Sequence, residues 1–318
     1  MIARCQKRFL APLAVLLGAM SVVAQSPDMA AVSVSHRETT RWQVGIVVEA
    51  VGGPCMGLYG TVPVPIDWPE QKVRVVDEQK SPWIGDVGFR VLDRGVKQML
   101  VHIPRIPSGG RAEALLTLEI DRFVLAAPED PDELVIPKRP PRELRIYLGT
   151  SPYIESRHRK IRDLARELTD DSLSAWKQIE VFYDHVREHV TYMNGPLKGA
   201  LAALRDGNGD CEELTSLFIA LCRAHKVPAR TVWVPDHCYP EFYLENAEGQ
   251  GTWFPCQAAG TRAFGTMPEL RPILQKGDNF KVPEKKERQR YVAEYLRGNS
   301  RASGGKPKVS FVRKKIST

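Results

Sequence analysis

One cysteine of the chain lies in a position that suits nucleophilic chemistry. Cys211 belongs to the segment "GNGDCEELTSLFIALCRAHKVPAR", residues 207–230, where two glycines precede it and two glutamates follow it. A cysteine in such a place can be an inert core residue, one half of a disulfide or a nucleophile. Only the thiolate form attacks carbonyl groups, so the chemistry depends on what surrounds the thiol.

The residues around Cys211 predict the start of an amphipathic helix. Asp210 is a favourable N-cap residue, and Glu213 three positions later completes a capping box. The apolar residues that follow recur at the spacing of one helix face: Leu214, Leu217, Phe218 and Leu221. Cys211 therefore falls in the first turn, where the helix dipole and the unpaired amides favour a thiolate. Cys222 falls on the apolar face and is predicted to be a core residue.

Acidic neighbours oppose the ionisation of Cys211. Asp210, Glu212 and Glu213 surround it in sequence, and nearby carboxylates raise the pKa of a thiol. The helix dipole alone is therefore not sufficient, and a base from another part of the chain is needed. On these residues alone, a structural and a catalytic role for Cys211 are equally open.

A second group of residues fits metal chemistry. The segment "HVREH", residues 185–189, matches an inverted zinc-protease motif. His185 and His189 are four residues apart on one side of a helix and could share a metal ion, with Glu188 as the base. The apolar face of this helix is centred near Val186, however, so both histidines lie at its flanks. A zinc protease and two surface histidines are the two interpretations of this segment.

The Cys211 segment resembles the cysteine motif of the transglutaminase-like superfamily. In that family a Gly-x-Cys sequence opens the central helix, and an Ile-Pro-Ala-Arg type turn leads into the next strand; "GDCEELTSLFIALCRAHKVPAR" follows this pattern. Upstream, "FYDHVREHVTY" resembles the family's helix before the cysteine loop. Downstream, "DHCYPEFYLENAEGQGTWFPCQ" resembles its histidine strand and the following strand. The resemblance covers about residues 145–260.

The resemblance implies an α+β domain of papain-like architecture with three catalytic residues. Carried over by position, Cys211 is the nucleophile, His237 is the base and Gln257 orients the imidazole. The family usually has an aspartate at the third position. Glutamine can accept a hydrogen bond from the imidazole but supplies no charge, so a non-catalytic binding module is also compatible with the sequence. A second departure is Lys226, where the family often has a glycine in a turn.

The reaction that the resemblance implies is acyl transfer through a cysteine thioester. Water as the acceptor makes the protein a protease or amidase, whereas an amine makes it a crosslinker of glutamine to amines. The expected substrate is a peptide or protein, and no metal or organic cofactor is implied.

The spacing of the strands beyond the helix can be examined without the family. If the strands on either side of Ala247 form an antiparallel hairpin, His237 faces Gln257, and Cys238 faces Cys256. Alternation then directs the catalytic pair toward the Cys211 helix and both cysteines into the core, as a cross-strand disulfide or as two buried free thiols. The same alternation argues against a zinc cluster of His237, Cys238 and Cys256.

The first half of the chain has the pattern of short strands. Apolar residues alternate in "RWQVGIVVE", and Gly and Pro turns separate further short runs up to residue 127. We therefore expect a small all-β sandwich over 41–127. Prolines among charged residues predict a linker over 128–144, and the transglutaminase-like domain is expected over 145–297.

Both ends of the chain differ from these domains. Residues 1–24 combine a basic start, a short apolar run and small residues at the −3 and −1 positions, which predicts a signal peptide and export to the periplasm or the exterior. No integral membrane segment is expected after cleavage, and a linker should occupy 25–40. Residues 298–318 contain basic but no acidic side chains. We favour a solvated basic tail there, with an edge strand in "KVSFVRKK" as the alternative.

The composition excludes several broad classes. A chain of 318 residues with 43% hydrophobic and 26% charged residues predicts globular domains rather than disorder. The net charge is +7, and it is concentrated in the two ends. Nucleic acid is not an expected partner, because the compartment is wrong and no aromatic residues are interleaved with the basic ones. An odd number of cysteines after cleavage predicts at least one thiol that is free or that pairs between chains. The sequence does not indicate the oligomeric state.

Overall fold

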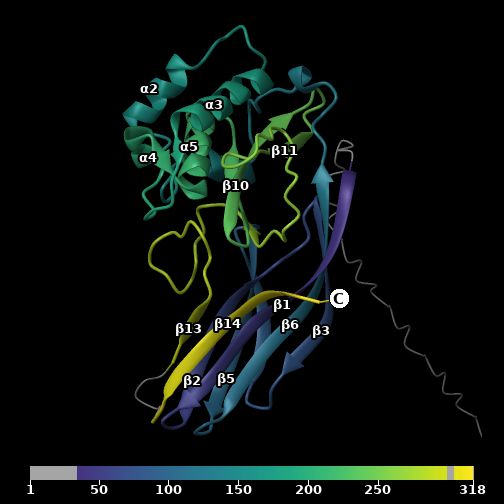
Figure 1. Cartoon of the computed structure of the whole chain (residues 1–318), viewed down its shortest axis with the longest axis vertical. Helices are drawn as coiled ribbons and strands as arrows, with labels where there is room; N and C mark the ends of the chain where they lie inside the picture. Colours follow the sequence, from purple (N-terminus) through teal and green to yellow (C-terminus); the bar gives the residue numbers. More distant parts are fainter. Residues whose placement is uncertain (1–33, 299–303, 318) are drawn as a thin grey trace, which may run out of the picture.

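The computed structural model describes residues 34–298 and 304–317. The predicted signal peptide over 1–24 and its cleavage site lie outside these residues. The chain forms an α+β molecule in which strand-rich and helix-rich parts occupy opposite ends (Figure 1).

The strand-rich part consists of two antiparallel sheets. The first has the order β14-β1-β6-β3, with the bounds β14 (Lys306–Ile316), β1 (Val34–Val51), β6 (Arg111–Leu125) and β3 (Gln71–Lys80). The second has the order β13-β2-β5-β4, with the bounds β13 (Tyr295–Arg297), β2 (Cys55–Val64), β5 (Val96–Ile106) and β4 (Asp86–Leu92). Apolar side chains of both sheets share one core, for example Val48 and Leu58. The sheets therefore form a β-sandwich, as the alternation in β1 predicts.

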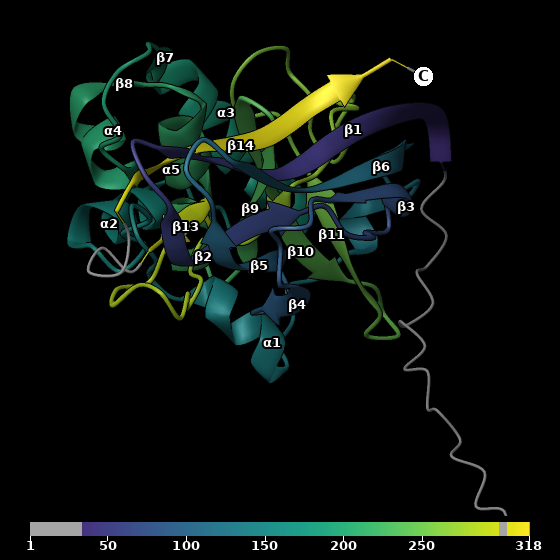
Figure 2. The same ribbon diagram turned by 90° about the horizontal axis from the view of Figure 1, so that it is seen from below.

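Both ends of the sandwich correct the sequence-based boundaries. β1 begins at Val34, so the predicted linker over 25–40 is wrong in its last residues. Residues 306–316 form β14, which pairs with β1 from Arg41↔Ile316 to Val51↔Lys306 (Figure 2). The favoured solvated tail is therefore wrong for these residues, and the edge-strand alternative is confirmed. Val309 and Phe311 explain this, because both side chains pack against the sandwich core.

The helix-rich part contains a third antiparallel sheet. Its order is β11-β10-β9-β12, with the bounds β11 (Gly251–Pro255), β10 (His237–Glu245), β9 (Ala229–Val234) and β12 (Gln275–Lys276). Its helices are α2 (Arg159–Glu167), α3 (Ala175–His189), α4 (Ala200–Asp206) and α5 (Cys211–Ala224). Helix α5 is central, because apolar side chains of the other helices and of the sheet pack around it. Cys222 lies fully buried in this core, as predicted.

Shorter elements lie between these parts or, in the case of two paired strands, within the helix-rich part. They are η1 (Pro131–Glu133), α1 (Arg142–Arg145), η2 (Ile146–Leu148), β7 (Thr191–Tyr192) and β8 (Asn208–Gly209). The first three lie in or just after the predicted proline-rich linker, where Val135 also bridges to Glu245 of β10. Among the helices of residues 34–298 and 304–317, none has both the length and the apolar character needed to cross a bilayer.

The β10–β11 hairpin has a different register from the predicted one. Phe242 pairs with Phe254, which is a shift of two residues relative to a hairpin centred on Ala247. The turn closes later, where the amide of Asn246 donates to the carbonyl of Gln250.

A shift of two residues keeps His237 and Tyr239 on one face and Cys238 and Phe242 on the other. The face that packs against α5 is the one with Cys238 and Phe242, so the expectation that alternation directs the His237 face toward this helix is wrong; His237 reaches Cys211 from the first position of the strand. The shift also separates Cys238 from Cys256, and all five described cysteines are free thiols. The disulfide is therefore wrong, and the alternative of buried free thiols is confirmed.

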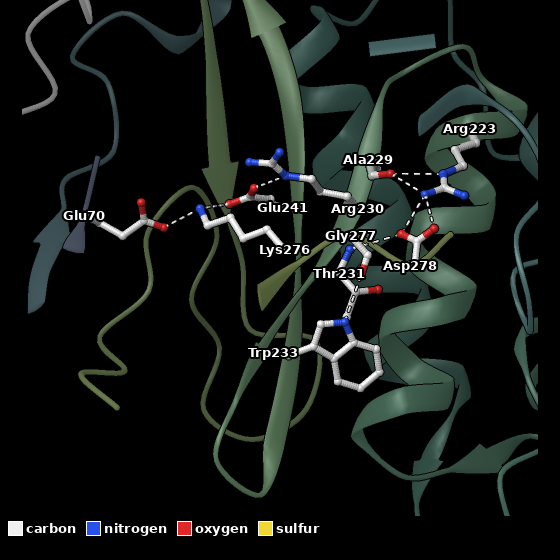
Figure 3. Close-up of polar contacts among 10 residues, drawn as sticks. All are labelled: Glu70, Arg223, Ala229, Arg230, Thr231, Trp233, Glu241, Lys276, Gly277 and Asp278. Carbon is white, nitrogen blue, oxygen red and sulfur yellow. Dashed lines mark hydrogen bonds and ion pairs between the residues drawn. The ribbon is translucent and has the colours of Figure 1, made fainter. Parts of the chain in front are cut away.

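Buried charges join the sandwich to the helix-rich part (Figure 3). The Lys276 side chain of β12 is 2% exposed, and its Nζ donates to Glu70 of the sandwich at 2.6 Å and to Glu241 of β10 at 2.8 Å. Arg122 of β6 is 1% exposed and donates to the backbone carbonyls of Glu70, Glu269 and Arg271. Because each group would be costly to bury alone, these contacts fix the relative position of the two parts.

Candidate active site

Helix α5 begins with the capping box that the sequence predicts. The Asp210 side chain accepts a hydrogen bond from the amide of Glu212 at 2.8 Å, and the Glu213 side chain accepts one from the amide of Asp210 at 3.1 Å. Gly209 is required before the cap, because a Cβ there would lie 2.3 Å from the Cβ of Glu213. Cys211 is consequently fixed as the first residue of the helix, at its positive end.

The histidine and the glutamine of the predicted triad are in direct contact. Nε2 of His237 lies 3.0 Å from Oε1 of Gln257. An amide oxygen only accepts hydrogen bonds, so Nε2 carries the proton in this contact and Nδ1 remains for Cys211. His237 is the first residue of β10 and follows Asp236, which has a positive φ of 58° in the tight turn from β9.

The surroundings of Cys211 strongly favour the thiolate. Hydrogen bonds from Cys238 and from His237, together with the charge of His237, lower the pKa of Cys211 to about 4, although burial opposes them. Burial raises the pKa of Cys238 well above its usual value, so this thiol keeps its proton and can donate it. The acidic neighbours that the sequence places beside Cys211 are thus outweighed.

The same interactions act on the base. Burial alone would lower the pKa of His237, but its hydrogen bonds with Cys211 and Gln257 and the charge of the thiolate raise it above the ordinary value. Cys211 and His237 therefore form a thiolate–imidazolium pair, in which each group stabilises the charge of the other.

Two side chains of α3 hold the loop that carries Gln257. The Tyr183 hydroxyl donates to the Gln257 carbonyl at 2.8 Å and accepts from the Ala263 amide at 3.0 Å. The Arg187 guanidinium donates to the carbonyls of Gln257, Ala258 and Gly260 at 2.8 to 3.1 Å. These hydrogen bonds from α3 fix the backbone of Gln257, so its side chain is free to face His237.

Arg187 lies inside the "HVREH" segment, and the histidines of that segment do not form a metal site. The rings of His185 and His189 stack with centroids 4.0 Å apart, and Nδ1 of His189 lies 2.9 Å from the carbonyl oxygen of His185. Over the part of the chain that the structure describes, no three His, Cys, Asp or Glu side chains converge as metal ligands. The zinc-protease interpretation thus lacks a third ligand, and Arg187 is the residue of the segment that reaches the site.

A cavity of about 430 Å³ contains both Cys211 and His237. Trp233 of β9 forms part of its wall, and the Gly277 carbonyl fixes the indole by accepting from Nε1 at 2.8 Å (Figure 3). The Arg290 guanidinium lies 5.2 Å from the Trp233 ring and pairs with Glu212. Burial raises the pKa of Glu212 to about 7, although Arg290 opposes the shift.

The sequence reasoning missed several of these residues. Cys238 was expected to be core only, although its position next to His237 on a strand beside α5 was the available signal. Arg187 and Tyr183 gave no signal, since their partners are backbone carbonyls and amides of a loop 70 or more positions away. Lys226 has a φ of 64°, which explains why glycine suits that turn in the family that the segment resembles.

The fold and the site together define a class of protein. A cysteine opens a buried central helix, and an adjacent antiparallel sheet supplies the histidine, which is the arrangement of papain-like α+β domains. Residues 162–258 form a domain of the transglutaminase-like superfamily, whose family model they match.

One solved structure has a similar fold, and two others give weaker matches. A crystal structure from Cytophaga hutchinsonii, described as a "putative cysteine protease", superposes with a TM-score of 0.56 at 15% identity, covering 89% of this chain and 93% of that one. A "putative protease" from Parabacteroides distasonis gives a TM-score of 0.28 at 13% identity over 70% of this chain and 47% of that one. The periplasmic domain of TgpA from Pseudomonas aeruginosa gives 0.31 at 12% identity, covering 68% and 89%. The chain has no match among curated proteins.

Proposed function

We propose that this protein is a thiol enzyme that hydrolyses peptide or amide bonds through a cysteine thioester. The contact of Nε2 of His237 with Gln257, beside a Cys211 thiol whose pKa is lowered to about 4, carries the proposal. A thiolate nucleophile, a proton donor and an orienting group are the set that acyl transfer needs, and the contacts among these three residues support the proposal.

In the proposed mechanism the Cys211 thiolate attacks the carbonyl carbon of the substrate. The amides at the start of α5, including that of Cys211, stabilise the oxyanion of the tetrahedral intermediate. The His237 imidazolium gives its proton to the leaving amine as the C–N bond breaks, and a thioester remains. His237 then takes a proton from water, the resulting hydroxide attacks the thioester, and release of the acid restores the thiolate and the imidazolium.

Water is the favoured acceptor because the site is open to solvent. Cys211 is only partly buried, and Tyr192 on the cavity wall is 54% exposed. A crosslinking enzyme has to exclude water from its thioester, and the open cavity argues against such exclusion. The description of the Cytophaga hutchinsonii structure agrees with hydrolysis.

Three probes test this function on the purified protein. Release of peptides from fluorescein-labelled casein measures hydrolysis, incorporation of dansylcadaverine into dimethylcasein measures amine transfer, and release of nitrophenol from p-nitrophenyl acetate measures acylation of the thiol. We expect hydrolysis and acylation, and we expect Cys211→Ala and His237→Ala each to abolish both. Turnover retained in either variant contradicts the mechanism, and dansylcadaverine incorporation that outpaces hydrolysis would make the protein a crosslinker.

A further inference from the structure

The first sheet of the sandwich extends beyond the sandwich core toward the catalytic cavity. In the β1–β14 pair, Arg313 lies opposite Val44 and Lys315 lies opposite Trp42. Val44 belongs to the sandwich core, and alternate residues of a strand share a face. Arg313 and Lys315 therefore point to the inner side of the sheet. They lie near the end of β14 that borders cavities lined by residues of the helix-rich part.

These two side chains line two cavities whose walls together include the three residues of the proposed triad. Arg313 lines the cavity that contains Cys211 and His237. Lys315 lines a second cavity of about 450 Å³, whose wall includes Gln257 and Trp42. Successive inward-facing residues of a strand are about 7 Å apart, so one short piece of β14 borders both cavities.

This wall is held in place by defined contacts. The Arg313 guanidinium donates to the Tyr291 hydroxyl at 2.6 Å and pairs with Glu294 at 3.4 Å. Nζ of Lys315 lies 3.3 Å from a Glu38 carboxylate oxygen. Across the second cavity, Arg122 anchors the segment from Glu269 to Arg271 through its carbonyls. The wall is therefore formed before any substrate arrives.

Resting on the proposed function, we propose that the sandwich forms one wall of the substrate cleft, and that the substrate is a polypeptide bound in extended form across both cavities. A reacting carbonyl at Cys211 has chain on both sides, and one cavity contains Cys211 and His237 whereas the other reaches Gln257. A small amide would fill only one of them. Guanidinium and ammonium groups have more N–H donors than these partners use, so Arg313 and Lys315 can donate to carbonyl groups of the bound chain.

The strand offers a matched pair of variants for the test. Arg313→Ala/Lys315→Ala removes two positive charges from the inner face, whereas Lys308→Ala/Lys314→Ala removes two from the outer face of the same strand. Binding of fluorescein-labelled casein, an unstructured polypeptide, is measured by anisotropy in the Cys211→Ala background. We expect the inner-face variant to weaken binding about tenfold, which corresponds to about 1.4 kcal/mol, and the outer-face variant to bind casein as the parent does.

Turnover separates this inference from the proposed function. In the active protein, the inner-face variant should lose more activity on casein than on p-nitrophenyl acetate, because only the polypeptide reaches both cavities. Three results would overturn the inference: equal casein binding by the two double variants, an equal loss of activity on casein and on p-nitrophenyl acetate in the inner-face variant, or no casein binding by the parent. Acylation by p-nitrophenyl acetate that depends on Cys211 and His237 would leave the proposed function standing in each of those cases; its absence would end the proposed function instead.

Discussion

Gln257 orients the His237 imidazole through a neutral amide. Its Oε1 lies 3.0 Å from Nε2 of His237, where it accepts the hydrogen bond that a carboxylate would otherwise accept. Because the amide carries no charge, the Cys211 thiolate is the charge that raises the pKa of His237, with the glutamine hydrogen bond in support and burial in opposition. The imidazolium is therefore stabilised mainly by the nucleophile itself.

The pH profile of kcat/KM should report this arrangement. We expect a bell-shaped profile, whose acidic limb follows Cys211 near pH 4 and whose basic limb follows the raised pKa of His237. Gln257→Ala should shift the basic limb to lower pH, because the imidazolium loses a partner. Gln257→Glu keeps the side-chain length, adds a charge and should shift it to higher pH. A basic limb that is the same in all three proteins would show that Gln257 does not act on His237.

Arg187 acts on the site through the Gln257 loop and is a positioning residue. Arg187→Ala removes three hydrogen bonds from a charged donor, and we expect a loss of stability of about 2 kcal/mol. The variant should also shift the basic limb to lower pH, as Gln257→Ala does, which a purely structural role would not do. His189→Ala, from the same helix, is the control and should keep the limb of the parent. Urea unfolding and the pH profile provide the two measurements.

At the scale of elements, the helix that carries the nucleophile could be predicted almost completely from the sequence. The N-cap Asp210, its capping-box partner Glu213 and the apolar face of the helix are all recognised from the spacing of neighbouring residues in the sequence. For the hairpin that carries His237, the sequence predicts which residues share a face, but the face that packs against α5 is the opposite one and the register differs by two residues. Shared faces follow from alternation, whereas register depends on how many residues the turn uses, and Asn246 to Gln250 forms a longer turn than expected.

Loss of the cap should weaken both the helix and the site. Asp210→Ala leaves the Glu212 amide without its acceptor, and we expect a cost of about 1 kcal/mol in the free energy of unfolding. Because Cys211 is the next residue, iodoacetamide alkylation of the thiol at pH 6 should also slow. Asp210→Asn keeps an acceptor and should stay close to the parent in both measurements. An Asp210→Ala variant as stable as the parent would mean that the cap contributes little.

At the scale of the molecule, the interface between the two parts could not be predicted. Lys276 and Glu70 are 206 positions apart, and the residues around each of them contain no pattern that predicts the other as its partner. The position of β14 could not be predicted either, because its basic residues favour a solvated tail and its pairing with β1 depends on residues more than 250 positions away. A buried cation between two carboxylates is costly to bury but specific, so it favours one relative placement of sandwich and catalytic part.

Removal of that cation should destabilise the whole molecule. Lys276→Met leaves Glu70 buried without its ion-pair partner and Glu241 with Arg230 alone, and we expect a loss of about 3–5 kcal/mol at pH 7. In the parent, burial alone would raise the pKa of Glu70, but the charge of Lys276 outweighs burial and the pKa is lowered. Glu70 therefore stabilises the fold at pH values above its unfolded pKa, and this contribution is lost as the pH falls through its folded pKa. In the variant, Glu70 can take a proton instead. The difference in urea stability between the two proteins should therefore shrink from pH 7 to pH 4, and a constant difference would contradict this reasoning.

The most direct test of the central claim is the rate of Cys211 alkylation by iodoacetamide as a function of pH, followed by peptide mass spectrometry. The other four described cysteines are internal controls, since burial raises the pKa of Cys55, Cys222, Cys238 and Cys256. We predict that Cys211 reacts fast from about pH 5 upward, and that His237→Ala moves its midpoint toward the value of about 8.5 that free cysteine shows. A Cys211 that follows the free-thiol curve in the unaltered protein would contradict the thiolate–imidazolium pair.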